Sequence, residues 1–340
     1  MKKTIKEKSM NNLKKVGLSA LAGSLAAFSA NAVEMSVAGS AAMTYINGDS
    51  SEVTGNPYGM NTSLAFSGSG DVNGYETSLT VVAADSVGGM SSAALTVDLG
   101  DMGKVSFDQG VGIGGISTID DKTPSAYEEV WDNLDSATGD ENGLVGGGNA
   151  GVFVYSNSVM GSSLSIQVGK GGSATSANGS PSGEGTSGTS WDFALTNNTL
   201  AEGLEVGVGY GKIANTNQDS ATGQDDTDDH RTAFVTYTMS GVTVGYQRAD
   251  VEDNTETNVD ERSDGWGVAI NLMDGLSVSY GEREIDFDNA GNVTEDQEGF
   301  AIAYTMGSAT VSFQNNETSN NGGTNGTNDE NTEINLSLAF

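Results

Sequence analysis

The feature that most constrains the fold is an alternation of apolar and polar residues that recurs in sixteen short segments. In the last segment, 332–340, the apolar face holds Ile334, Leu336, Leu338 and Phe340, and the residues between them are polar or small. A period of two residues is typical of a β-strand with one apolar and one polar face. The segments that we predict as strands are 33–45, 61–69, 75–85, 91–99, 104–110, 150–157, 163–170, 189–198, 204–212, 230–239, 242–250, 264–273, 276–285, 298–306, 309–317 and 332–340.

The connections between these segments alternate between tight turns and longer polar stretches. Asp274-Gly275, for example, is a two-residue hairpin signal, whereas 111–149 is the longest stretch without a pattern. An even number of strands joined in this way predicts an all-β, up-and-down antiparallel barrel with long outer loops and short periplasmic turns. Strands of about 9–11 residues have the length that crosses a bilayer at a tilt.

A soluble β-sandwich and a solenoid are the alternatives, because a single strand with one apolar face fits them as well. A sandwich spanning 33–340 would need two domains, since single cores stop growing near about 250–300 residues. No linker or break in composition divides the chain. The polar faces are mostly small, as in Ser36, Ser163, Ser277 and Gly267, which suits the wall of a water-filled lumen. We therefore expect a transmembrane barrel.

The start of the chain predicts export. Six lysines precede a short apolar run, 16–28, and a small-x-small cleavage site, Ala30-Asn31-Ala32. This order is typical of a secretory signal peptide, with an amphipathic leader or anchor helix as the alternative. The run is too short to span a bilayer of about 30 Å as a helix. We expect cleavage near Ala32-Val33, so that 1–32 is the signal peptide and 33–340 forms the barrel.

The charge and the rare residues exclude several functions. The chain has 14 basic and 46 acidic residues, and six Lys and Glu7 precede Val33, which leaves 8 basic and 45 acidic residues. Such a balance repels nucleic acid and favours cations as partners. The chain has no cysteine, which excludes disulfides, thiol catalysis and thiolate metal sites. His230 is the single histidine, so a catalytic triad would have to be built on it, and its place at the end of a strand next to acidic residues favours a solvated residue instead. We expect no enzymatic activity.

The signal peptide, the sixteen alternating segments, the short turns, the outsized third loop and the terminal Phe340 together resemble a Gram-negative general-diffusion porin. The resemblance covers 33–340 as a pattern. It implies a homotrimer in the outer membrane that forms a passive channel for small hydrophilic solutes, with the third loop, 111–149, folded into the lumen as the constriction. The last segment also resembles the signature that the outer-membrane assembly machinery reads, so we expect Phe340 to act as an assembly signal.

The third loop holds the candidate site. It begins with glycines between Gly110 and Gly115 and continues with acidic residues around Tyr127 and Trp131, where the spacing of 125–131 predicts a short helix. Carboxylates at a constriction favour cations. The residues expected there are Asp120, Asp121, Glu128, Glu129, Asp132 and Asp135. The alternative is a solvated acidic loop outside the pore.

The basic residues depart from the pattern that the resemblance implies. Porins of this type set a basic cluster on the wall opposite the acidic loop, but here only Arg283 is expected to be basic and inward-facing. Lys170, Lys212 and Arg248 share the outward register of their strands at the loop ends, where we expect contact with lipopolysaccharide phosphates or a neighbouring subunit. A net cation preference is therefore expected in place of a transverse field. Small outward residues such as Gly39 are expected to let neighbouring barrels approach closely.

No cofactor is expected. Residues 286–297 open like a calcium loop, but Ala290 and Gln297 stand where ligands are needed, so acidic loops are expected to gather Ca²⁺ only loosely. Two other functions remain open. One is a channel specific for a class of solutes, and the other is a non-transport surface barrel whose acidic loops bind a partner or divalent ions. The sequence does not name the solutes.

Overall fold

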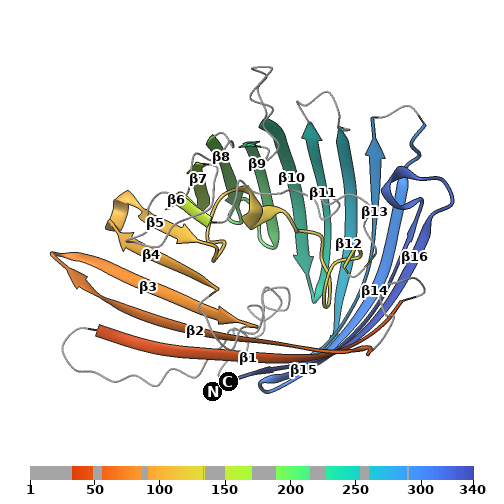
Figure 1. The fold of residues 1–340 in the computed structure, drawn as a ribbon, viewed down its shortest axis with the longest axis horizontal. Helices are drawn as coiled ribbons and strands as arrows, with labels where there is room; N and C mark the ends of the chain where they lie inside the picture. Colours follow the sequence, from red (N-terminus) through yellow and green to blue (C-terminus); the bar gives the residue numbers. More distant parts are fainter. Residues whose placement is uncertain are drawn as a thin grey trace, which may run out of the picture.

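The chain folds into a single closed barrel of sixteen strands (Figure 1). The computed structural model describes residues 33–48, 56–85, 91–132, 134, 150–170, 189–214, 227–252, 260–288 and 291–340. Each strand pairs antiparallel with its neighbours in the sequence, and β1 pairs antiparallel with β16 to close the barrel. The predicted all-β, up-and-down architecture and the strand count are confirmed.

The strands begin and end as follows: β1 Val33–Gly48, β2 Tyr58–Val72, β3 Tyr75–Ala84, β4 Ser92–Asp98, β5 Lys104–Gln109, β6 Ala150–Val159, β7 Ser162–Lys170, β8 Thr189–Asn197, β9 Leu204–Ala214, β10 Thr227–Met239, β11 Val242–Glu252, β12 Glu261–Met273, β13 Leu276–Phe287, β14 Glu295–Met306, β15 Ala309–Ser319 and β16 Asn328–Ala339. Several extend beyond the predicted segments toward the long loops. In these strands the apolar alternation marks only part of the length, because backbone pairing continues through polar residues.

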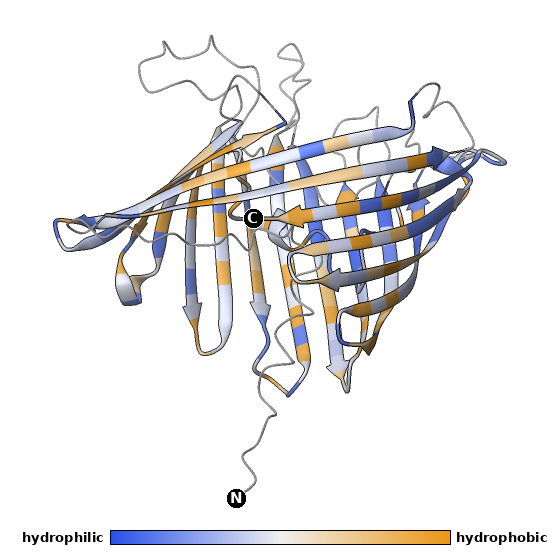
Figure 2. Cartoon of the chain, turned by 90° about the horizontal axis from the view of Figure 1, so that it is seen from below, coloured by the Kyte–Doolittle hydropathy of each residue, from blue (hydrophilic) through white to orange (hydrophobic). Residues whose placement is uncertain are grey.

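The barrel carries its apolar side chains on the outside. Leu95, Val208 and Phe300 are 46%, 46% and 43% exposed, whereas the inward-facing Gln314 is 1% exposed. Figure 2 shows the resulting succession of hydrophobic and hydrophilic residues along single strands. A soluble sandwich would bury its apolar faces, so this arrangement excludes that alternative. In the part of the chain that the structure describes, no helix is long and apolar enough to cross a membrane.

The last residue takes part in the closure of the barrel. The backbone N–H of Gly39 donates to the carbonyl of Phe340 at 2.8 Å, and the N–H of Phe340 donates back at 2.9 Å. A Cβ on Gly39 would lie only 2.5 Å from Cε2 of the Phe340 ring. Gly39 therefore makes room for a side chain of its own barrel, and its predicted role in the approach of neighbouring barrels stays a prediction.

The buried apolar cluster lies between a loop and the inner wall. It contains Ile116 and Ile119 of the 3₁₀-helix η3 (Ile116–Ile119), with Ala194 of β8, Phe234 of β10 and Ala249 of β11. A barrel of this size has no central core of its own. The cluster thus marks the place where the connection after β5 enters the lumen.

Candidate functional site

The connection after β5 turns into the barrel at Asp108. This carboxylate is fully buried and accepts hydrogen bonds from the backbone N–H groups of Val111, Gly112 and Ile113, at 2.8, 2.9 and 2.9 Å. Gly112 has a φ of 77°, in the left-handed region that glycine adopts without strain. The chain therefore bends inward at a turn that one acid organises. We call residues 110–132 the inner segment.

The helix η3 is held against β7 to β9. The carboxylate of Asp192 on β8 accepts from the N–H of Ile116 at 2.6 Å, and the hydroxyl of Ser165 on β7 accepts from the N–H of Gly115 at 2.9 Å. Ile116 rests on the bare backbone of Gly209 on β9, where a Cβ would come within 2.7 Å of its Cγ1. Polar and apolar contacts together fix the start of the inner segment to the wall.

The inner segment then crosses β10 and β11. The side chain of Gln247 on β11 accepts from the N–H of Lys122 at 2.7 Å and donates to the carbonyl of Ile119 at 2.7 Å. The side-chain amide of Gln247 thus satisfies one backbone N–H and one backbone carbonyl that have no partner in a helix or a sheet here. Beyond it, Pro124 lies over Gly245 of β11 and Gly267 of β12.

The stretch 125–131 does not form the predicted helix. Its backbone groups bind the wall instead, because the N–H of Ala126 donates to the hydroxyl of Ser279 on β13 at 2.8 Å. The side chain of Asn316 on β15 donates to the carbonyls of Glu129 and Asp132 at 2.9 and 3.0 Å. These contacts satisfy the groups that a helical turn would have paired.

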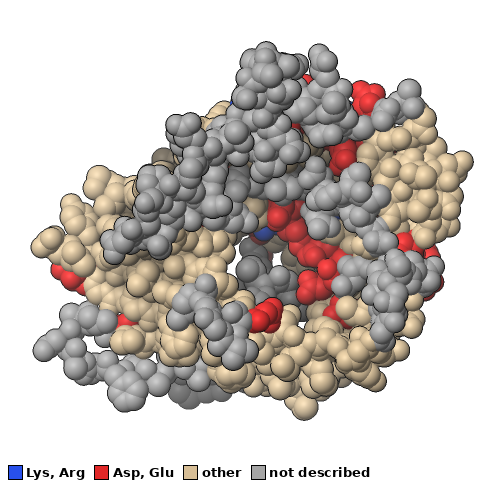
Figure 3. All heavy atoms as spheres, viewed as in Figure 1, with Lys and Arg blue, Asp and Glu red and all other residues tan. Residues whose placement is uncertain are grey.

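The last contacts reach β16. The hydroxyl of Tyr127 donates to Glu333 of β16 at 2.9 Å, and Gln314 of β15 donates to the carboxylate of Asp132 at 3.0 Å. The Arg283 guanidinium lies 4.4 Å from the centroid of the Trp131 ring. The inner segment therefore runs along the inner wall from β5 to β16. In Figure 3, acidic side chains gather along one side of the hollow in the centre of the view, beside a small basic patch.

Five of the six acids predicted for the site lie in the inner segment, and Asp135 lies outside the described residues. Burial, and secondarily the charge of Glu129, raise the pKa of Asp120 to about 6. Burial and the charges of Glu129, Asp132 and Glu333 raise the pKa of Glu128 to about 8. Burial and a hydrogen bond to Glu129 raise the pKa of Asp121 far above its usual range. Asp121 and Glu128 therefore retain their protons near neutral pH, whereas Asp120 is mostly charged there.

Among the described residues, three basic side chains are on the inner side, two more than predicted. Arg283 faces inward as predicted, but it is 4% exposed and lies against Trp131. Lys122 lies 5.8 Å from the centroid of the Phe234 ring, and Lys104 forms an ion pair with Asp98 at 3.2 Å. The prediction that Arg283 is the only such residue was wrong for Lys104, which shares the inward register of the buried Ser106 and Asp108 on β5.

Two of the predicted outward basic residues form ion pairs near the long-loop ends of their strands. Lys212 on β9 pairs with Asp229 at 3.1 Å. Arg248 on β11 pairs with Asp250 at 3.5 Å and Asp264 at 3.7 Å. Lys170 ends β7, and its side chain lies outside the description. These residues share the outward register with exposed apolar side chains such as Val208.

The wall formed by β1 to β4 carries hydroxyls rather than basic groups at its described inward positions. Pairs of these hydroxyls face each other on neighbouring strands, and Ser67 and Thr80 are hydrogen-bonded at 3.1 Å. The inward hydroxyl residues of this wall are Ser36, Ser40, Thr44, Ser63, Ser67, Ser69, Ser78, Thr80, Ser92 and Thr96. The arrangement provides no basic cluster to oppose the acids of the inner segment.

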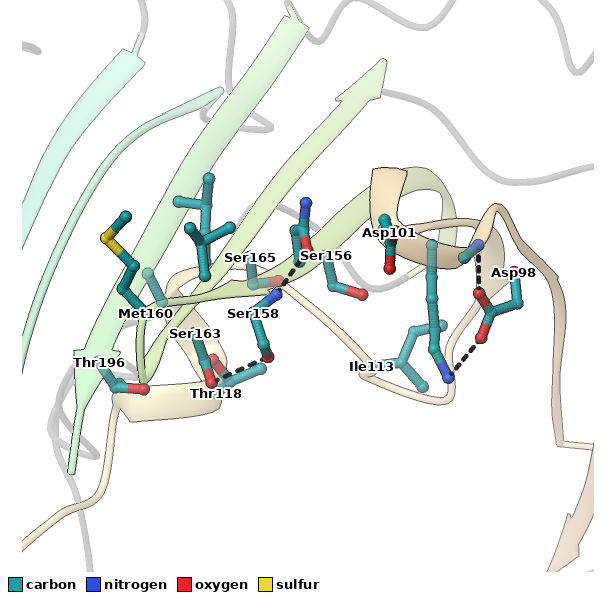
Figure 4. Close-up of a pocket in the computed structure, with 17 residues that line it drawn as sticks. Asp98, Asp101, Ile113, Thr118, Ser156, Ser158, Met160, Ser163, Ser165 and Thr196 are labelled. Carbon is teal, nitrogen blue, oxygen red and sulfur yellow. Dashed lines mark hydrogen bonds and ion pairs between the residues drawn. The ribbon is translucent and has the colours of Figure 1, made fainter. Parts of the chain in front are cut away.

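A recess of about 660 Å³ opens between β4 to β8 and the start of the inner segment. Figure 4 shows the Asp98 carboxylate paired at one end and a group of hydroxyl residues at the other. The hydroxyl residues of the recess are Thr118, Ser156, Ser158, Ser163, Ser165 and Thr196. Hydroxyls both donate and accept hydrogen bonds, so this surface suits neutral polar solutes.

Metal-binding geometry is not found in the described part of the chain. No group of three or more His, Asp or Glu side chains there is placed to hold a metal ion. The acid-rich stretch 215–226 lies outside the described residues.

Solved structures with a similar fold are porins. An anion-selective porin from Comamonas acidovorans matches with a TM-score of 0.65 at 11% identity, over 91% of this chain and 100% of that chain. OmpT, an outer membrane protein of Vibrio cholerae, matches with a TM-score of 0.65 at 12% identity, over 93% and 100%. A variant of the Rh. blastica porin matches with a TM-score of 0.56 at 13% identity, over 90% and 100%. No protein-family model and no curated protein sequence matches the chain. The chain therefore has the sixteen-strand barrel fold of porins.

Proposed function

We propose that the chain forms a passive, water-filled channel for small hydrophilic solutes across the outer membrane of a Gram-negative bacterium. The observation that carries this proposal is the closed barrel itself, apolar outside and polar inside, with the inner segment crossing its lumen. Sixteen strands enclose a lumen wide enough for water, and a segment along the inner wall narrows it without filling it. The inner segment, whose residues after Gly110 belong to the third loop, 111–149, is the constriction.

The channel prefers cations. The inner segment places Asp120, Asp121, Glu128, Glu129 and Asp132 together, and the described wall of β1 to β4 offers hydroxyls opposite them. The Comamonas acidovorans porin is anion-selective with a similar fold, so the fold does not set the sign of selectivity. The side chains of the lumen do, through the sign of the local potential.

The outer surface of the barrel contacts the membrane and its partners. The exposed apolar bands face acyl chains, and Lys212 and Arg248 lie near the long-loop ends, where lipopolysaccharide phosphates are found. Residues 1–32 are removed on export, and Phe340 is read by the outer-membrane assembly machinery. The barrel associates as a homotrimer, a proposal that rests on the porin likeness.

A solute-specific channel is the second candidate, and the hydroxyl-lined recess favours it. A recess of about 660 Å³ falls in the size range of small-molecule sites, about 300–1,000 Å³. Neutral polyhydroxylated solutes match its hydroxyls. Interruption of the ion current by such a solute, weakened in Ser163→Ala/Ser165→Ala, would favour this candidate over general diffusion.

The test of the proposed function is a single-channel recording of refolded protein in a planar bilayer. We expect stepwise conductance and, under a salt gradient, a reversal potential of the sign that cation preference produces. Protein that refolds but gives no conductance steps would leave a non-transport surface barrel as the better interpretation. Conductance with an anion-selective reversal potential would overturn the assignment of the acidic cluster to the constriction.

A further inference from the structure

Four inward-facing glycines stand side by side on four adjacent strands. Gly245 of β11 pairs with Gly267 of β12, Gly267 pairs with Gly281 of β13, and Gly281 pairs with Gly299 of β14. We call this set the glycine row. Because a glycine has no side chain, the row forms a shallow transverse groove in the inner wall. Along this groove the wall consists of backbone alone on its inner side.

The inner segment occupies this groove. A Cβ on Gly245 would lie 2.6 Å from Cδ and 2.9 Å from Cγ of the Pro124 ring. A Cβ on Gly267 would lie 2.7 Å from the carbonyl oxygen of Pro124. One on Gly281 would lie 2.9 Å from the carbonyl oxygen of Trp266 in the wall and 3.1 Å from Cγ1 of Val130 in the inner segment. The space left between 123–130 and the wall is about 10 Å³, which holds at most a single water.

Hydrogen bonds flank the groove on both sides. Gln247 stands two residues from Gly245 and binds the backbone of the inner segment before Pro124. Ser279 stands two residues from Gly281 and binds Ala126 just after it. The inner segment is therefore tethered around the row, and any side chain added in the groove pushes it toward the lumen.

We propose that the glycine row is the seat that determines how far the constriction projects into the lumen, and with it the pore cross-section and the position of the acidic cluster. This inference rests on the proposed channel function. It assigns to Gly245, Gly267 and Gly281 a positioning role that is separate from the charge of the acids. Gly299, at the end of the row, makes room for the side chain of Asn316, which itself binds the inner segment. With alanine at position 267, the carbonyl oxygen of Pro124 would have to move about 0.7 Å away from the new Cβ to reach an ordinary van der Waals distance.

The strand backbone itself tolerates the substitution. None of the four glycines of the row has a φ in the left-handed region, so alanine fits their backbone conformation. Gly265 offers a matched control on the same strand and the same face as Gly267. A Cβ there would meet its nearest neighbour, Cγ2 of Thr123, at an ordinary 3.4 Å.

The experiment compares single-channel conductance and reversal potential of refolded wild type, Gly267→Ala, Gly245→Ala and Gly265→Ala. We expect lower conductance and a shifted reversal potential in the first two variants, and wild-type behaviour in Gly265→Ala. Pro124→Ala removes the atoms of the inner segment that a Cβ at position 245 would meet, and leaves Cγ2 of Thr236, a side-chain atom of the wall, at 2.9 Å. It should therefore restore conductance to Gly245→Ala but not to Gly267→Ala, whose contact is with the Pro124 backbone.

Each outcome bears on one proposal. If wild type conducts while Gly267→Ala and Gly245→Ala match it or conduct more, the glycine row is not the seat, although the channel function stands. If refolded wild type does not conduct, the proposed function itself fails. Should Gly267→Ala not refold, as judged by the loss of heat-modifiable mobility on gels, Gly245→Ala and its Pro124→Ala rescue decide the question.

Discussion

Raising the pH from 5 to 9 should strengthen the cation preference of the channel. The pKa of Asp120 is about 6 and that of Glu128 about 8, both raised first by burial in the inner segment. A carboxyl with a raised pKa is neutral at low pH and gains its charge only as the pH passes that value. Asp120 and Glu128 therefore add two negative charges to the constriction over this range, the first near pH 6 and the second near pH 8.

The size of the effect follows from distance and screening. At about 6 Å, one carboxylate and a passing monovalent cation interact by roughly 0.7 kcal/mol in water, of which about 0.4 kcal/mol remains at 0.1 M salt. That energy corresponds to about a twofold change in local cation concentration for each charge, and to about fourfold for two charges. At 1 M salt the screening length of about 3 Å leaves little of the effect.

The assay is the reversal potential under a KCl gradient, measured at pH 5, 7 and 9 at low and at high mean salt. Glu128→Gln should remove the step near pH 8 and leave the step near pH 6. Glu202→Gln, on the exposed turn before β9, serves as the matched control because it changes the same net charge away from the lumen. A reversal potential that stays flat from pH 5 to 9, or moves toward anions, would refute the reasoning.

The remaining predictions concern the loop and the assembly. Neutralising Glu128, Glu129 and Asp132 to amides should lower cation preference by a few-fold, whereas amides at three acids of 214–229 should change it little, as reversal potentials would show. Deleting 123–142 should raise single-channel conductance, and unchanged conductance would place the constriction elsewhere. Tyr127→Phe, which leaves the buried Glu333 without its 2.9 Å donor, should weaken the loop contact by about 1–3 kcal/mol and increase open-channel noise. Native mass spectrometry in mild detergent should give three subunits.

The barrel was predictable because its signal is local. Alternation with a period of two survives in a single strand, and neighbouring hairpins pair with each other, so sequence order and spatial order coincide. Strand ends were less predictable. Residues such as Glu330 pair with Glu317 across β15 and β16 beyond the apolar alternation, where no periodic signal marks them.

The acids of the candidate site were predictable, but their environment was not. A run of carboxylates in an outsized loop is visible in the sequence, whereas the wall residues that hold the loop are distant from it. Asp192 binds Ile116 across 76 positions, and Gln247 binds Lys122 across 125 positions. The same distant contacts removed the predicted helix at 125–131, since the wall satisfies its backbone groups. Local spacing carries no information on such partners.

The small inward residues do not all serve the same purpose. Gly267 was taken as part of a smooth wall that leaves room for water, yet the structure fills that room with Pro124. The signal that would have shown this is the alignment of Gly245, Gly267, Gly281 and Gly299 at one level of four consecutive strands. Hairpin registers predicted from the turns would have placed these four glycines beside one another on adjacent strands.

Aromatic residues lie on the outer face behind the glycine row. Each glycine of the row has an outward aromatic neighbour in its own strand: Tyr246, Trp266, Tyr280 and Phe300 respectively, with Trp266 and Tyr280 in ring contact at 5.8 Å. A glycine within a strand costs roughly 0.5–1 kcal/mol relative to alanine, so four cost about 2–4 kcal/mol. Large rings outside and the inner segment inside cover the exposed backbone and offset that loss. The wall can be thin at the constriction because it is supported from both sides.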